Sequence, residues 1–264
     1  MARWVVRFGY EGSSYGGWAR QPGRRTIEGA LLRGLARPGS SSTVRPETLE
    51  VASRTDRGVS ARANALTIES RLDGPALLRV LNGTSPEMWF TDAAPVPDGF
   101  RVRRARRRVY RYFESDWGRS LERTRAAAQL FCGEVDVRSF GRRLTNGPPV
   151  RRPIEAVEVR TEPDGWTIEV RAPSFVWGMV RKIVAALREV DAGRLELGTL
   201  AAALRGEGRT TLPLAEPEPL VLWEVDYPIT WTVHWTGPNR RQRAAAQEGY
   251  SSSRARVRLL RELS

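Results

Sequence analysis

One aspartate in the sequence stands in a setting where its carboxylate could do chemistry. Asp56 lies between Arg54 and Arg57 in a segment that also carries Gly58 and that joins two strand-like stretches. Neighbouring cations keep a carboxylate ionised even where it is half-buried, and an ionised aspartate can act as a nucleophile or as a base. Asp-Arg-Gly is also an ordinary turn sequence, so the composition of the segment does not decide between a turn and a catalytic loop.

A second candidate is an arginine-rich run that ends in two tyrosines. Residues 101–111 hold seven arginines and no acidic residue. Side chains two positions apart on a strand share one face, so Tyr110 and Tyr112 would present their rings together with an arginine. Such a surface suits RNA phosphates and unstacked bases, whereas the alternative is a solvated strand edge that discourages aggregation. The arginines of this run that we expect to contact RNA are Arg104, Arg106 and Arg108.

The third candidate is a single arginine in an apolar segment. The sequence predicts a helix from Ser174 to Val190 that is apolar nearly all round, with Arg181 in its middle. A buried guanidinium without an anion is costly, so Arg181 should face a carboxylate or a ligand phosphate. A structural ion pair inside the protein explains the pattern equally well.

The scarcity of two residue types excludes several kinds of site. Cys132 and His234 are the only cysteine and the only histidine of the chain. A Cys/His zinc cluster and an internal disulfide are therefore not expected. If the protein is an enzyme, its chemistry rests on carboxylate, tyrosine, arginine or backbone groups.

The charge of the chain favours a polyanionic partner. Its 264 residues contain 43 Lys and Arg against 30 Asp and Glu, a formal net charge of +13, and Lys182 is the only lysine. Arginine offers a planar fork of donors that suits phosphates, although a GC-rich genome would also enrich it. No run of about 18 apolar residues predicts a membrane-spanning helix. The strand-like pattern starts by Trp4 and leaves no core for a signal peptide, so we expect a cytoplasmic protein.

These candidates need elements that position them, and the periodicity of the sequence predicts two successive α+β units with mainly antiparallel sheets flanked by helices. We expect an N-terminal domain over residues 1–104 with the Asp56 loop, a C-terminal domain over residues 105–229 and a basic tail over residues 230–264. The tail could form a helix near residues 255–263, or fold only on an anion. The predicted strands span residues 4–10, 49–53, 65–69, 109–113, 154–160, 166–172 and 220–227, and the predicted helices span 27–35, 74–82, 121–132, 174–190 and 197–205.

Taken together, four stretches resemble the tRNA pseudouridine synthase A (TruA) family. Residues 16–22 and 26–29 resemble the GWQRQP and TVQG elements of the family, and residues 54–59 resemble its GRTDAGV loop. Residues 110–112 resemble its YRY strand, and residues 175–184 resemble its SFLxxMVRNIV helix. The order and the approximate spacing hold over residues 4–227, which makes the combination more specific than any single motif.

The resemblance implies the pseudouridine synthase fold, with two similar subdomains around a central cleft. It implies an isomerase of tRNA processing that converts uridine to pseudouridine in the anticodon stem-loop, without a metal or an organic cofactor, in a cytoplasmic, RNA-binding homodimer. Asp56 would be the catalytic nucleophile, Tyr110 the ring that stacks on the flipped base, Arg181 the partner of Asp56, and Arg54 the residue that displaces the target nucleotide. The remaining RNA contacts are expected from Arg20, Arg57, Tyr112 and Lys182.

The sequence also departs from the family pattern. Arg57 and Ser60 stand where members usually carry alanine and histidine, and Trp177-Gly178 replaces a pair of histidines. These changes bear on the substrate position more than on the class of reaction. Two other classes remain open, a non-catalytic RNA-binding protein with the same basic face and a single-strand DNA-binding module. Neither explains why a carboxylate should lie in a site for an anionic ligand.

Overall fold

The computed structural model describes residues 1–36, 43–85, 87–114, 120–141, 147–162 and 165–236, which divide into two compact units. Among the described residues, unit 1 comprises those of Met1–Arg106 together with residues 221–236, and unit 2 comprises those of Arg107–Leu220. The described residues form an α+β fold with mostly antiparallel strand pairs and five helices, which confirms the predicted class. Among them, no helix combines the length and the apolar character that crossing a membrane requires.

Unit 1 is built on a sheet in the order β11-β4-β1-β3-β10, with β2 also paired to β3. Its pairs are antiparallel except for β10, which runs parallel to β3. Val5 and Val6 point to opposite faces of β1 and are both fully buried, so this strand lies at the centre of the unit. The strands are β1 (Ala2–Tyr10), β2 (Val44–Val51), β3 (Ser60–Ser70), β4 (Met88–Pro95), β10 (Leu220–Asp226) and β11 (Val233–His234).

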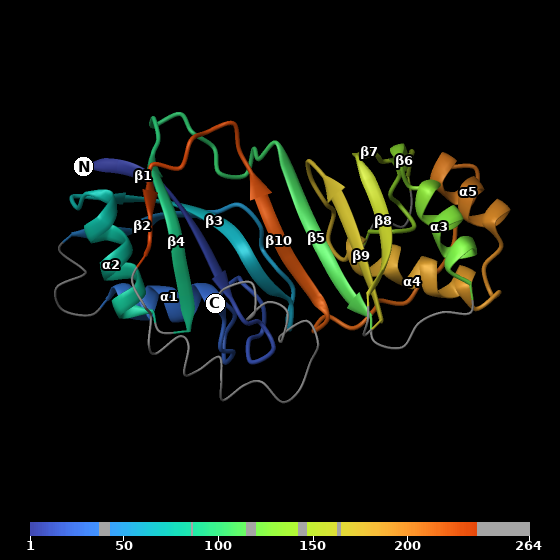
Figure 1. Ribbon diagram of the computed structural model, residues 1–264, viewed down its shortest axis with the longest axis horizontal. Coiled ribbons are helices and arrows are strands. Elements are labelled where there is room, and N and C mark those ends of the chain that lie inside the picture. The colour runs from blue at the N-terminus through green and yellow to red at the C-terminus, as the bar shows by residue number, and fades with distance from the viewer. Residues whose placement is uncertain (37–42, 86, 115–119, 142–146, 163–164, 237–264) are drawn as a thin grey trace. The chain divides into compact units, whose positions relative to one another are not determined.

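Two helices complete unit 1, and they lie next to one another in Figure 1. Helix α1 (Ile27–Leu35) starts where the sequence predicts, because the Thr26 side chain accepts a hydrogen bond from the Gly29 amide. Helix α2 (Gly74–Thr84) starts in the same way on Asp73 and packs against β4.

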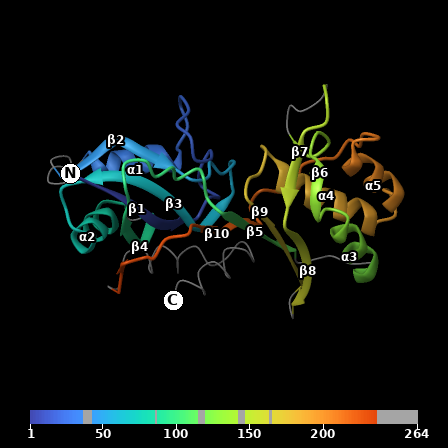
Figure 2. The same ribbon diagram turned by 90° about the horizontal axis from the view of Figure 1, so that it is seen from above.

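Unit 2 contains the antiparallel strands β5, β9 and β8 in that order and a separate pair, β6 and β7. Figures 1 and 2 show its three helices gathered on one side of the three-stranded sheet. The strands are β5 (Arg107–Glu114), β6 (Gly133–Asp136), β7 (Arg151–Ile154), β8 (Ala156–Glu162) and β9 (Gly165–Ala172), and the helices are α3 (Leu121–Gln129), α4 (Met179–Asp191) and α5 (Leu197–Arg205).

The structure differs from the sequence prediction in the placement of two elements. Strand β10 was expected in the C-terminal domain, but it pairs with β3 and belongs to unit 1 from Val221 onward. The tail was expected to begin at residue 230, but β11 pairs with β4 and extends the sheet of unit 1. The predicted tail helix lies outside the described residues.

Candidate active site

The Asp56 loop connects β2 to β3, and the residue before Asp56 fixes it to the body of unit 1. Thr55 is buried, and its hydroxyl group lies 2.8 Å from the hydroxyl group of Tyr10. The Thr55 carbonyl accepts a hydrogen bond from the Trp18 amide at 3.0 Å. The side chain of Asp56 is half-buried, whereas Arg54 and Arg57 are exposed. The loop thus carries a half-buried carboxylate between two exposed arginines. Its backbone is fixed to unit 1 by the hydrogen bonds of Thr55.

Close backbone packing under this loop depends on two glycines. A Cβ atom on Gly17 would lie 3.1 Å from both the Arg57 amide nitrogen and the Thr55 carbonyl oxygen, and Gly17 has a φ of 104°. A Cβ atom on Gly12 would lie 2.1 Å from the Val59 carbonyl oxygen, a distance that no side chain permits. The glycine-rich stretch before α1 is therefore a platform for the Asp56 loop, a role that the sequence did not reveal.

An aromatic cluster supports the same platform. The ring of Trp18 is buried against Phe8 at 5.6 Å and against Tyr10 at 6.2 Å, between ring centroids. Phe8 stacks in turn on Phe90 of β4 at 5.6 Å. Pairs of this kind add to the stability that burial alone gives. The tryptophan of the first motif is thus a core residue whose amide also holds the Asp56 loop at Thr55.

Unit 2 carries the other two predicted catalytic residues. Tyr110 on β5 is half-buried, and its ring meets the ring of Phe175 edge-on, with 5.1 Å between the centroids. Arg181 lies in the first turn of α4, and its Nε atom donates a hydrogen bond to the Ala215 carbonyl at 2.6 Å. The Ala215 amide donates back to the Arg181 carbonyl at 3.3 Å. The orientation of Arg181 is therefore set in part by a backbone segment of its own unit.

The start of α4 corrects the expectation about Arg181. The helix was predicted from Ser174, which would place Arg181 in its middle, but it begins at Met179 after Gly178, whose φ is 78°. A residue in this left-handed conformation cannot continue a helix. Arg181 is consequently near the helix N-terminus and half-exposed, so the argument from a buried mid-helix charge is wrong.

Comparisons with known proteins decide the family. A family profile described as tRNA pseudouridine synthase matches residues 127–228. Proteins named tRNA pseudouridine synthase A from Thermococcus kodakarensis and Thermococcus sibiricus are 39% and 35% identical over 227 and 226 residues, which is 85% of this chain and 84% and 85% of those proteins. A protein of the same name from Pyrococcus abyssi is 35% identical over 228 residues, 85% of this chain and 84% of the relative.

The chain belongs to the tRNA pseudouridine synthase A family. The predicted resemblance is confirmed, and the protein is an enzyme of the isomerase class. Asp56 lies in unit 1, and Tyr110 and Arg181 lie in unit 2. A shared catalytic site of the three residues stays a prediction from the resemblance to the family.

Two of the expected RNA contacts of this family member point into the protein. Tyr112 is fully buried, and its hydroxyl group bonds with Arg188 and Glu216, so the expectation of an open surface shared with Tyr110 is wrong. Lys182 donates from Nζ to the carbonyls of Ser139 at 3.1 Å and Gly141 at 3.3 Å. Desolvation by burial lowers the pKa of Lys182, which fits an ammonium group held by backbone oxygens rather than by solvent.

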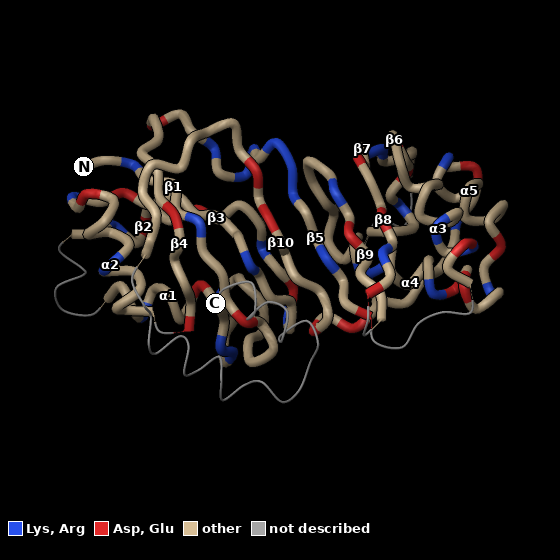
Figure 3. Tube along the Cα trace, viewed as in Figure 1, with Lys and Arg blue, Asp and Glu red and all other residues tan. Residues whose placement is uncertain are grey.

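The arginine-rich run contains both exposed and paired side chains. Arg104 and Arg106 are exposed and precede β5, whereas Arg108 is buried and donates to the Pro173 carbonyl. Arg106 forms an ion pair with Asp226 at 2.6 Å. Figure 3 shows both acidic and basic positions on β5, β9 and β8 of unit 2. The positive charge of this run is therefore partly neutralised within the fold. Among the other predicted contacts, Arg20 is exposed in unit 1.

Proposed function

We propose that the protein isomerises uridine to pseudouridine in tRNA, in the anticodon stem-loop, and that Asp56 is the carboxylate that starts the reaction. The observation that supports this most directly is the Asp56 loop, in which a half-buried carboxylate stands on a backbone fixed by Thr55 and Gly17. A binding protein gains nothing from a carboxylate placed against RNA phosphates, whereas a cofactor-free isomerase needs one. Relatives named tRNA pseudouridine synthase A over most of the chain support the same assignment.

The reaction exchanges one bond of the nucleoside for another. The bond between the ribose C1′ and N1 of uracil breaks, the base turns, and a bond forms between C1′ and C5. The proton on C5 leaves to solvent and N1 takes up a proton, so the composition of the nucleotide is unchanged. The target base is stacked in the RNA and must be flipped out before a side chain can reach it. The carboxylate of Asp56 then acts as the nucleophile on the flipped nucleotide, and the bond that it forms is broken again before the product leaves, so Asp56 is regenerated.

The other residues take supporting roles in this proposal. The half-buried ring of Tyr110, set edge-on by Phe175, stacks on the flipped uracil and keeps it in place while it is detached. The resemblance to the family gives Arg181 the role of partner to Asp56 in the reaction. Arg54, which is exposed beside Asp56, displaces the target nucleotide from the stem-loop. The homodimer and the cytoplasmic location stay predictions from the resemblance.

The test is tritium release from unmodified tRNA labelled at C5 of uridine. We expect the wild-type protein to release tritium and the Asp56→Ala variant to be slower by more than about 1000-fold, because the nucleophile is lost. Asp98→Ala, which removes an exposed aspartate of the same unit, is the control and should react at the wild-type rate. Tritium release by Asp56→Ala at the wild-type rate would refute the assignment of Asp56. No release by the wild-type protein from any tRNA would refute the reaction itself.

A further inference from the structure

A cluster of polar side chains in unit 2 binds the segment of Ala215 and Glu216, which contacts Arg181. The guanidinium of Arg188 donates to Glu114 Oε2 at 3.0 Å from Nε, to the Tyr112 hydroxyl at 3.0 Å and to Glu216 Oε2 at 2.6 Å. The Tyr112 hydroxyl itself donates to Glu216 Oε2 at 3.2 Å. We call these four residues, Tyr112, Glu114, Arg188 and Glu216, the Arg188 cluster.

One peptide bond separates the cluster from the residue that binds Arg181. Glu216 follows Ala215, which exchanges hydrogen bonds with Arg181 in both directions, by its carbonyl at 2.6 Å and by its amide at 3.3 Å. Arg181 and Arg188 are seven residues apart on α4, so they lie on one face of the helix, two turns or about 10 Å apart. The two arginines therefore hold adjacent residues of the same segment.

The charges within the cluster favour this arrangement. The hydrogen bond from Arg188 is the main cause that lowers the pKa of Glu216, and desolvation by burial is the main cause that raises the pKa of Tyr112. Burial by itself would lower the pKa of Arg188, but the bonds to Glu216 and Glu114 outweigh it and raise that pKa. The lowered pKa of Glu216 and the raised pKa of Tyr112 favour an ionised carboxylate and a neutral phenol, the states that the hydrogen bonds between them require.

We propose that Arg188 and Glu216 are positioning residues for the reaction, because they fix the Ala215–Glu216 segment that orients the Arg181 guanidinium. Tyr112 adds a second link, since it lies two residues after Tyr110 on β5 and binds both members of the pair. The cluster thereby couples the strand that carries Tyr110 to the helix that carries Arg181. The inference rests on the proposed role of Arg181, and its test separates the two.

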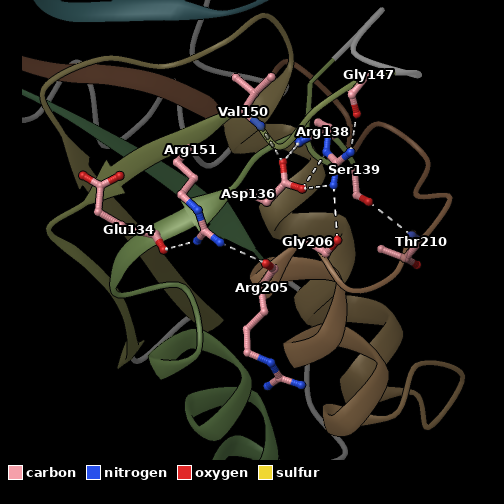
Figure 4. A network of polar contacts seen from close by, with 10 residues as sticks. All are labelled: Glu134, Asp136, Arg138, Ser139, Gly147, Val150, Arg151, Arg205, Gly206 and Thr210. Atoms are coloured by element: carbon pink, nitrogen blue, oxygen red, sulfur yellow. Dashed lines mark hydrogen bonds and ion pairs between the residues drawn. The ribbon is translucent and has the colours of Figure 1, made fainter.

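Unit 2 offers a matched control in a second arginine network, shown in Figure 4. Asp136, which is 1% exposed, accepts a hydrogen bond from Arg138 Nε at 2.6 Å and one from the Val150 amide at 3.1 Å. Arg138 also donates to the carbonyls of Gly147 at 2.6 Å and Gly206 at 3.3 Å. Arg138→Lys therefore removes a guanidinium that binds a carboxylate in the same unit. It leaves the hydrogen bonds between Arg181 and Ala215 in place.

The first measurement needs no catalytic activity. Exchange of the Arg181 Nε–H proton is followed by NMR, with the signal assigned by its loss in Arg181→Lys. We expect exchange to be about tenfold faster in Arg188→Lys and in Glu216→Gln, because the acceptor segment is released, and to be unchanged in Arg138→Lys. Glu216 has an exposed side chain, so Glu216→Gln tests the proposal even if Arg188→Lys does not fold. Wild-type exchange in both cluster variants would overturn the proposal.

The second measurement separates kcat from KM on unmodified tRNA. Because a misplaced Arg181 affects the chemical step rather than tRNA binding, we expect kcat of both cluster variants to fall about tenfold with little change in KM. Arg138→Lys should retain its kcat at a comparable loss of thermal stability. Equal kcat in the cluster variants and the control would overturn the positioning role. A wild-type protein that forms no pseudouridine would refute the proposed function, while the exchange measurement would still decide whether the cluster orients Arg181.

Discussion

A carboxylate that acts on a flipped base must stay in place while that base is detached and turned, and Asp56 is held through its neighbour in the chain. The hydroxyl group of Thr55 is buried against that of Tyr10, which also accepts a hydrogen bond from Asn64 at 3.4 Å. Asn64 Nδ2 donates in addition to the carbonyl of Ser53, two residues before Thr55, at 2.9 Å. The position of the Asp56 carboxylate thus depends on a buried network of hydrogen bonds that holds the residues before it in the chain.

Thr55→Val tests this at a single residue. Valine keeps the shape but removes the hydroxyl group, so we expect the free energy of unfolding to fall by about 1 kcal/mol and kcat to fall more than KM rises. Urea unfolding and tritium release measure the two effects. Thr55→Ser keeps the hydroxyl group and should restore most of kcat. If Thr55→Val loses stability but retains kcat, the bond to Tyr10 does not position Asp56.

At the scale of single residues, the sequence marks candidates by their chemistry, whereas it does not show which side chains are buried. Asp56 stood out because arginines flank it, and Arg181 stood out because it interrupts an apolar run. The period of two placed Tyr112 on the face of Tyr110, but only the three-dimensional packing shows that Tyr112 lies in the interior against Arg188. The support from Ala215 could not be predicted, since a backbone carbonyl leaves no signal in the sequence.

At the scale of elements, the prediction misplaced ends and missed strands, among them the eight-residue β4 and the two-residue β11. Helix α5 and strand β10 were expected almost as they are, because their apolar spacing is regular. The start of α4 was misplaced because an apolar run does not show the left-handed conformation of Gly178. Strand β11 was missed because two residues are too few to show an alternation of apolar and polar side chains. Its place is set by pairing with β4.

Strand β11 is held to unit 1 by side chains as well as by its backbone. The His234 Nδ1 atom lies 2.6 Å from Asp92 Oδ1, and the Arg7 guanidinium lies 4.4 Å from the centre of the Trp231 ring. Val233 packs where α2 begins, and a Cβ atom on Gly74 would lie 2.5 Å from its Cγ2 atom. The first residue of α2 must therefore be small, because Val233 of β11 occupies the space beside it.

Gly74→Ala tests the fit of β11 against α2. Alanine usually stabilises a helix by up to about 1 kcal/mol relative to glycine, but the contact with Val233 should reverse the sign and cost about 1 kcal/mol or more. Urea unfolding of the variant measures the change. Gly74→Ala combined with Val233→Ala should regain stability relative to Gly74→Ala, because the second change removes the clashing methyl groups. A stabilised Gly74→Ala single variant would show that Val233 does not pack there.

At the scale of the whole molecule, the net charge divides unevenly along the chain. Residues 237–264 carry seven arginines and two glutamates and so contribute +5 of the total of +13. The family profile ends at residue 228, before this segment. In the described part of the chain, arginines such as Arg106, Arg111 and Arg188 are paired with carboxylates, which reduces their attraction for phosphates. The terminal segment is thus a concentrated source of positive charge for a polyanion.

Removing residues 237–264 tests whether that charge contributes to tRNA binding. A chain that ends at Thr236 keeps β11, since the Trp235 amide bonds to the Thr91 carbonyl at 2.8 Å. Each arginine that contacts a phosphate makes the negative slope of log binding constant against log salt concentration steeper by about 0.7 to 0.9. We therefore expect weaker binding and a shallower slope after truncation. The rate at saturating tRNA should be unchanged, because Asp56, Tyr110 and Arg181 are retained. Filter binding over a series of salt concentrations measures the slope.

A full-length variant with Arg240, Arg241 and Arg243 changed to glutamine is the control for the length of the chain. If the arginines act through their charge, this variant should lose part of the slope, in proportion to the phosphate contacts removed, while keeping every residue position of the tail. A truncated protein with the wild-type slope would show that the terminal charge makes no phosphate contact, and the binding energy would then have to come from residues 1–236. A loss of affinity with an unchanged slope would point to non-ionic contacts of the tail instead.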